Sequence, residues 1–119
     1  MKLGMFIMVC VINYIIGSIP FAYIITLKAS GKDIRQEGSG NVGATNVFRV
    51  MGILWGLLVF FLDAGKGWLA VKFSQFIINE KDFTIQLSNI TLNHKIILIC
   101  AVLWVVLGHI FPIFLGFRG

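Results

Sequence analysis

Residues 38–49 read GSGNVGATNVFR and separate two long apolar segments of the chain. Within six positions come Gly38, Gly40 and Gly43, which allow sharp turns and close approach of another group to the backbone. A glycine-rich turn that leads into a helix directs unpaired N–H groups and the positive end of the helix dipole at one point. Arg49 adds a planar guanidinium that matches phosphate geometry. The stretch indicates an anion site, with a solvated loop and helix cap as the alternative.

The composition is typical of a membrane protein. Of the 119 residues, 58% are hydrophobic and 13% are charged, and the mean hydropathy is +0.92. One small soluble domain cannot bury so much apolar surface. The net charge of +5 is better explained by anionic lipid headgroups and phosphorylated substrates than by nucleic acid. The sequence therefore predicts an all-α integral membrane helical bundle and no nucleic-acid partner.

Three apolar runs predict three transmembrane helices, at residues 3–27, 50–71 and 96–117, in a single membrane domain over residues 1–119. At about 1.5 Å per residue the first run spans about 37 Å, enough to cross a hydrocarbon core of about 30 Å. The glycine-rich loop between the first two runs carries four basic residues, which favours the cytoplasmic side and an external N-terminus. These four are Lys28, Lys32, Arg35 and Arg49.

Prolines and two charged residues interrupt these runs. Pro20 and Pro112 cannot donate a backbone hydrogen bond, so each predicts a kink or a helix break. Asp63 and Lys66 lie three residues apart on one helix face. Because isolated charges are costly inside a membrane, we expect a structural ion pair between them, with Lys66 snorkelling towards the interface.

The connection between the second and third runs, residues 72–95, is more polar. In it, Phe83, Ile85 and Leu87 alternate with polar residues. This alternation predicts a short strand or a segment that lies on a surface.

Three stretches carry a resemblance to a known family: GSIPFAY at 17–23, GSGNVGATNVFR at 38–49 and GHIFPIFLGFRG at 108–119. They are similar to the bacterial acyl-phosphate-dependent glycerol-3-phosphate acyltransferases, the PlsY type. The resemblance runs from the first apolar segment to the last residue. It implies transfer of a fatty acyl group from acyl phosphate to the 1-hydroxyl of glycerol 3-phosphate. The product is lysophosphatidic acid, made for phospholipid biosynthesis in the bacterial cytoplasmic membrane.

The resemblance also implies roles for individual residues. Ser39 and Arg49 are the expected catalytic residues: Ser39 holds phosphate oxygens, and Arg49 neutralises charge and orients the acyl phosphate. His109 is expected to donate a hydrogen bond in the site, with a buried structural histidine as the alternative. No metal or nucleotide cofactor is implied. The residues expected to bind substrate or phosphate are Gly38, Gly40, Asn41, Asn46 and His109, with the backbone N–H groups of Gly40 and Asn41 as donors.

Two features of the family are missing from these residues: a glycine-rich, lysine-bearing run after FRG, and a third motif with a histidine and an asparagine. We therefore expect an N-terminal part of the family's fold, whose catalysis depends on a complementing C-terminal segment. A small membrane transporter or channel subunit is an alternative, because broken helices with polar residues at mid-depth are typical of transporter sites. A non-catalytic membrane fragment is another.

Overall fold

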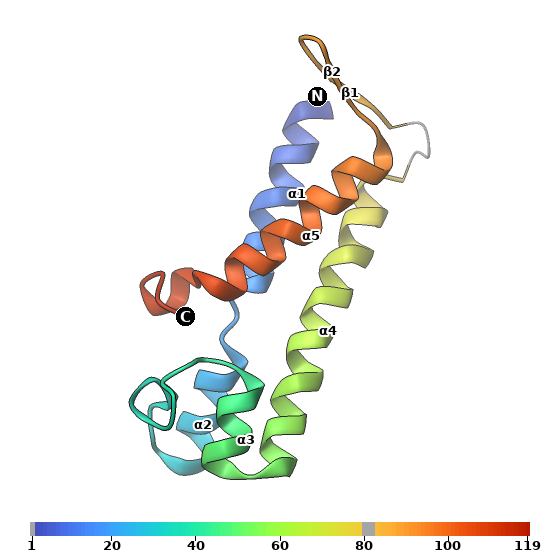
Figure 1. Cartoon of the computed structure of the whole chain (residues 1–119). Coiled ribbons are helices and arrows are strands. Elements are labelled where there is room, and N and C mark those ends of the chain that lie inside the picture. Colours follow the sequence, from blue (N-terminus) through green and yellow to red (C-terminus); the bar gives the residue numbers. More distant parts are fainter. Residues whose placement is uncertain (1, 80–82) are drawn as a thin grey trace.

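Figure 1 shows the computed structural model of the chain, which describes residues 2–79 and 83–119. The helices are α1 (Lys2–Gly17), α2 (Phe21–Ser30), α3 (Ala44–Met51), α4 (Ile53–Ile77) and α5 (His94–Ile110), with 3-10 turns η1 (Ile34–Gln36) and η2 (Ile113–Leu115) and strands β1 (Ile85–Leu87) and β2 (Ile90–Leu92). Within the described ranges, three stretches are long and apolar enough to cross a membrane: Lys2–Ser30, Ile53–Ile77 and His94–Leu115. The predicted all-α membrane bundle is confirmed.

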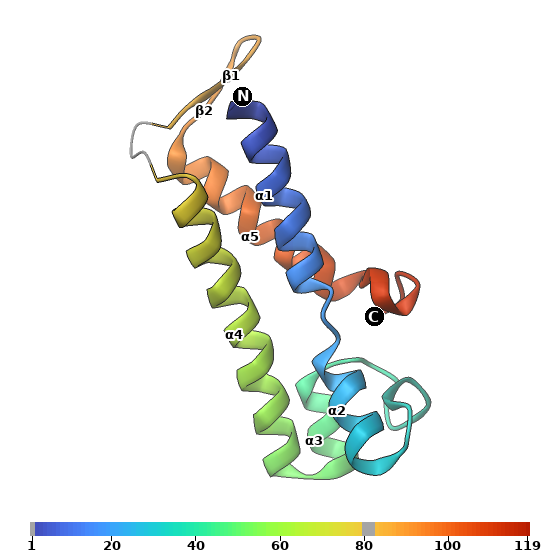
Figure 2. The ribbon, with the colours of Figure 1, turned by 180° about the vertical axis from the view of Figure 1, so that it is seen from behind.

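The first membrane segment is broken, as Pro20 predicts. The N–H of Ser18 donates to the Tyr14 carbonyl at 2.9 Å and the N–H of Ile19 to the Ile16 carbonyl at 3.2 Å, which closes α1. Pro20 has no N–H to continue the ladder, and α2 begins after it. Figures 1 and 2 both show α2 beside α3, next to the first turns of α4.

The second segment lies further along the chain than predicted. It begins at Ile53 rather than at residue 50, because Gly52, with a φ of 97°, separates the short helix α3 from α4. It ends at Ile77 rather than at residue 71. The polar residues in the extra turns fit a helix because Ser74 is fully buried and its hydroxyl donates to the Ala70 carbonyl at 2.8 Å.

Helix α1 packs most extensively against α5, and two glycines bring their backbones together. A Cβ on Gly17 would overlap the carbonyl of Val105, and a Cβ on Gly108 would overlap the carbonyl of Tyr14. Small residues at such crossings permit the van der Waals contact that drives helix association in lipid. The buried stripes that meet here are Val9, Asn13 and Gly17 on α1 and Ile97, Ala101, Val105 and Gly108 on α5.

Polar contacts connect α4 to this helix pair. The side-chain amide of Asn13 donates to the Ser74 hydroxyl at 2.8 Å and to the Ala101 carbonyl at 3.3 Å. Such interhelical hydrogen bonds satisfy polar groups that lipid cannot. They fix one end of α4 against α1 and α5.

A small antiparallel hairpin covers the same end of the bundle. Ile85 pairs with Leu92 and Leu87 with Ile90, which confirms the strand that the alternation predicted. Phe83 and Ile85 are buried in a cluster with residues of α1 and α5. The hairpin therefore closes the end of the bundle opposite α2 and α3 (Figure 1).

Candidate active site

The glycine-rich loop, residues 38–43, folds around the side chain of Asn46 in α3. This side chain is buried, and its Oδ1 accepts the N–H of Ser39 at 3.1 Å. Its Nδ2 donates to the carbonyls of Glu37 and Asn41, both at 3.0 Å. Both polar atoms of Asn46 thus hold the backbone of the loop in shape.

Two glycines of this loop are needed for its shape. Gly38 and Gly40 have φ values of 54° and 75°, in the left-handed region that side chains other than glycine disfavour. A Cβ on Gly38 would also overlap the Oδ1 of Asn46. Both glycines therefore act through the backbone.

The free backbone donors of the loop are not the ones predicted. The N–H of Gly40 already donates to the Glu37 carbonyl at 2.9 Å, and the N–H of Asn41 donates to the Ser39 hydroxyl at 3.3 Å. In the part of the chain that the structure describes, the N–H groups of Ala44 and Thr45 make no such bond. The N–H groups of Val42 and Gly43, which lead into this helix, make no such bond among the described residues either, so a row of backbone donors precedes and begins α3, where the helix dipole favours an anion.

Arg49 lies in the last turn of α3 and is exposed. We expected it at the start of a membrane helix, but α3 is a separate helix whose Phe48 packs against Gly56 of α4. The structure shows no ion pair of Arg49 with any described residue. Thr45 lies four residues earlier, so Arg49 shares a helix face with the start of α3.

Arg35, by contrast, is paired within its own turn. Its guanidinium donates to both carboxylate oxygens of Asp33, with the shortest contact at 2.7 Å, and lies 4.8 Å from the ring centre of Tyr23. The hydrogen bonds from Arg35 hold the pKa of Asp33 below its ordinary value, and the carboxylate raises the pKa of Arg35. Arg35 thus lies in the loop between α2 and α3, as expected, but its charge is paired with Asp33 and its guanidinium lies over Tyr23 of α2.

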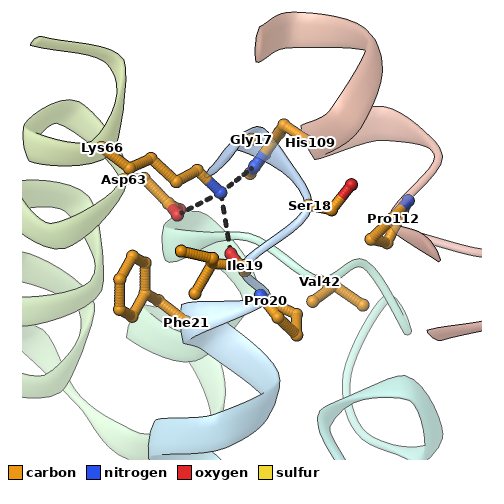
Figure 3. A pocket seen from close by; sticks show the side chains of 10 residues that line it. All are labelled: Gly17, Ser18, Ile19, Pro20, Phe21, Val42, Asp63, Lys66, His109 and Pro112. Atoms are coloured by element: carbon orange, nitrogen blue, oxygen red, sulfur yellow. Dashed lines mark hydrogen bonds and ion pairs between the residues drawn. The ribbon is translucent and has the colours of Figure 1, made fainter. Parts of the chain in front are cut away.

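A small pocket lies where the α1–α2 break meets α4 and α5 (Figure 3). In it, the Lys66 Nζ lies 3.0 Å from Asp63 Oδ1, 2.9 Å from the Ile19 carbonyl oxygen and 3.0 Å from His109 Nδ1. The predicted ion pair is confirmed. The predicted snorkelling is wrong, because the Lys66 side chain is only 5% exposed and points into the bundle.

The pocket connects to the glycine-rich loop through Val42, which is buried and forms part of its wall. Pro20 and His109 line the same pocket. Hydrogen bonds link Ser39, Asn41 and Asn46 to one another. Among the described residues, no hydrogen bond joins this group to Arg49 or to His109.

On the other side of His109, an apolar groove of ≈ 550 Å³ runs between α4 and α5. Its walls include Phe60, Trp68 and Val102, and it also reaches Asp63, Lys66 and His109. His109 therefore stands between the small pocket and an open apolar groove.

The contacts of Lys66 with Ile19 and His109 were not predicted from the sequence. In the structure, the buried residues of α4 follow helical spacing, and Lys66 is one of them. They are Gly56, Val59, Lys66, Ala70 and Ser74.

A sequence model of the glycerol-3-phosphate acyltransferases matches residues 7–119. The chain belongs to this family. It is 41% identical over 119 residues to glycerol-3-phosphate acyltransferase 3 of Dehalococcoides mccartyi, covering 100% of this chain and 54% of the relative. Over 115 residues it is 40% identical to the glycerol-3-phosphate acyltransferase of Staphylococcus saprophyticus, covering 97% and 54%.

A solved structure agrees with this assignment. The crystal structure of PlsY (YgiH), an integral membrane glycerol 3-phosphate acyltransferase, in its glycerol 3-phosphate form matches with a TM-score of 0.72 and 38% identity. The match covers 96% of this chain and 50% of that one. The chain is thus a multi-pass membrane protein of this family, and it spans about half the length of the relatives it matches.

Proposed function

We propose that these residues supply the first half of an acyltransferase that acts on acyl phosphate and glycerol 3-phosphate in the bacterial cytoplasmic membrane. The glycerol hydroxyl oxygen forms an ester bond to the acyl carbon, and the bond from that carbon to the phosphate oxygen breaks. Inorganic phosphate leaves with the hydroxyl proton, and lysophosphatidic acid remains. Family membership and the glycine-rich loop built around Asn46 carry this proposal.

The loop and α3 offer a phosphate three kinds of donor. The hydroxyl of Ser39 is exposed, the N–H groups of Ala44 and Thr45 are open at a helix start, and Arg49 is exposed on the same helix. Both substrates carry phosphate, so a site made of donors and one cation suits them. Catalysis here would rest on positioning and on fixed dipoles rather than on a covalent intermediate.

His109 is the proposed donor from the bundle side. It reaches the pocket that Val42 of the loop also lines, and it borders the apolar groove. A substrate with a phosphate at the loop and an apolar chain towards the lipid would pass close to this ring. The remaining groups of the site would come from a C-terminal segment like that of the relatives.

Acyl transfer is expected when residues 1–119 are joined to the C-terminal half of the Staphylococcus saprophyticus relative, and little or none from the 119-residue polypeptide by itself. The reason is that the relatives carry roughly as much chain again. The assay measures labelled lysophosphatidic acid formed from acyl phosphate and glycerol 3-phosphate in detergent. Robust turnover by the 119 residues alone would contradict the need for a second half. An inactive but correctly inserted chimera would contradict the proposed function.

We further propose that the glycine-rich loop faces the cytoplasm and the hairpin faces outwards. In a chain without Cys10 and Cys100, Asn89→Cys is expected to react with an impermeant thiol reagent in intact cells, and Ser39→Cys only after lysis. Both positions are exposed in the structure, so the difference reports the membrane side rather than burial. Equal labelling of both in intact cells would rule out this orientation.

A further inference from the structure

The side chain of Lys66 ends at a point where three membrane segments meet (Figure 3). Its Nζ contacts Asp63 of its own helix, the Ile19 carbonyl in the α1–α2 break, and His109 of α5. The ring of Phe21 lies 5.8 Å away. The contacts with the Ile19 carbonyl and with His109 Nδ1 have hydrogen-bond geometry, whereas the contact with Asp63 Oδ1 is an ion pair.

This arrangement determines which nitrogen of His109 carries the proton. An ammonium group can only donate, so the Nδ1 of His109, at 3.0 Å from the Lys66 Nζ, must accept. A neutral imidazole that accepts at Nδ1 carries its hydrogen on Nε2. The adjacent Asp63 carboxylate, 3.0 Å from the same Nζ, stabilises the charged form of the lysine.

We propose that Lys66 is a positioning residue, which holds His109 as the Nε2–H tautomer and ties α5 to the break between α1 and α2. The ring, which lines both the small pocket and the apolar groove, then keeps one fixed N–H donor, at Nε2. Only the role of this N–H donor in acyl transfer rests on the proposed function. The tautomer of His109, and the connection of α5 to the α1–α2 break through Lys66, follow from the contacts themselves.

A structural ion pair alone would not need this geometry. Asp63 and Lys66 could satisfy each other on one helix face, as a pair three residues apart does. Instead, Lys66 reaches across to two other segments, far from it in sequence. Elsewhere, α4 is joined to α1 by the hydrogen bond between Asn13 and Ser74, which involves no titratable group. A connection between these helices therefore does not by itself require a lysine.

The test reads the tautomer directly, by nitrogen NMR of histidine-labelled protein in lipid bilayers. The chain has two histidines, so His94→Gln leaves His109 as the only signal. In this background we expect an unprotonated Nδ1 and a protonated Nε2. Lys66→Met should remove this preference and give a mixture of tautomers. Lys72→Met is the matched control, because Lys72 is an exposed lysine of the same helix, and it should leave the tautomer unchanged.

Two results would overturn the inference: a protonated Nδ1 with Lys66 in place, or an unchanged tautomer in Lys66→Met. The first does not require the Lys66 variant, so the test remains valid if Lys66→Met fails to fold.

In an active chimera, Lys66→Met should lower kcat about 2- to 10-fold, as for one lost hydrogen bond, with less change in KM for glycerol 3-phosphate. An inactive chimera with the expected tautomer would overturn the proposed function and leave the positioning role standing.

Discussion

Replacing Arg49 by alanine is expected to lower kcat/KM for acyl transfer about 10- to 150-fold, the range that loss of one charge-assisted hydrogen bond predicts. The physical reason is the setting of its guanidinium. Arg49 is exposed on α3, shares a helix face with the open N–H groups at the start of that helix, and forms no ion pair with another described residue. Its charge is therefore available to a phosphate. The measurement is steady-state acyl transfer in the chimera, with normal membrane insertion checked for each variant.

Two further variants separate the geometry of Arg49 from its charge. Arg49→Lys keeps the charge but loses the planar pair of donors, so it should restore activity only in part. Arg35→Ala is the matched control, because that guanidinium is already neutralised by Asp33 and stacked on Tyr23. It should be nearly silent in transfer. If Arg35→Ala were as damaging as Arg49→Ala, or Arg49→Ala were harmless, the phosphate would bind elsewhere.

Gly108→Ala is expected to destabilise the helix bundle by about 3 kcal/mol, at the upper end of what overpacking usually costs. The added methyl group would overlap the Tyr14 carbonyl and approach the Ser18 N–H. Both are backbone groups, which cannot turn aside as a flexible side chain can. The two helices would have to separate, and the contacts along their buried stripes would loosen. Unfolding of the 119-residue chain in mixed micelles of rising SDS fraction measures the loss.

The control for this prediction is Gly65→Ala in α4. A Cβ at Gly65 has no neighbour within 4 Å, so alanine should be neutral or stabilise by up to about 1 kcal/mol through its better helix propensity. Equal stabilities of Gly108→Ala and Gly65→Ala would show that α1 and α5 do not cross as closely as the structure has it.

The outline of this fold could be predicted from the sequence because its signals are local. Runs of more than 20 apolar residues identify membrane segments by length alone. Pro20 breaks a helix through its own missing N–H. The Asp63–Lys66 pair follows from spacing on one helix. None of these predictions required knowledge of what lies next to the segment.

The parts that were missed depend on neighbours far away in the chain. Lys66 points inwards because Ile19 and His109 offer acceptors there. The sequence of α4 alone does not indicate these partners. The resemblance implied a phosphate-binding role for Asn46, and nothing in the sequence indicated which groups its amide would bond to. The fold surrounds that amide with the backbone of the loop. Residue type indicated a polar role in both cases, while the partner was set by tertiary structure.

The crossing of α1 and α5 also has a consequence for biosynthesis. A ribosome makes about 5–20 residues per second, and α5 begins at His94, roughly 80 residues after α1 ends at Gly17. On this scale α1 is complete about 4–15 s before its main partner exists. Ser74 belongs to α4 and is made before α5 begins, whereas Ala101 is made only with α5, so Asn13 lacks both partners for most of that interval and Ala101 for all of it. The first helix to be synthesised therefore cannot complete its packing until α5, the last helix of the bundle, has been made.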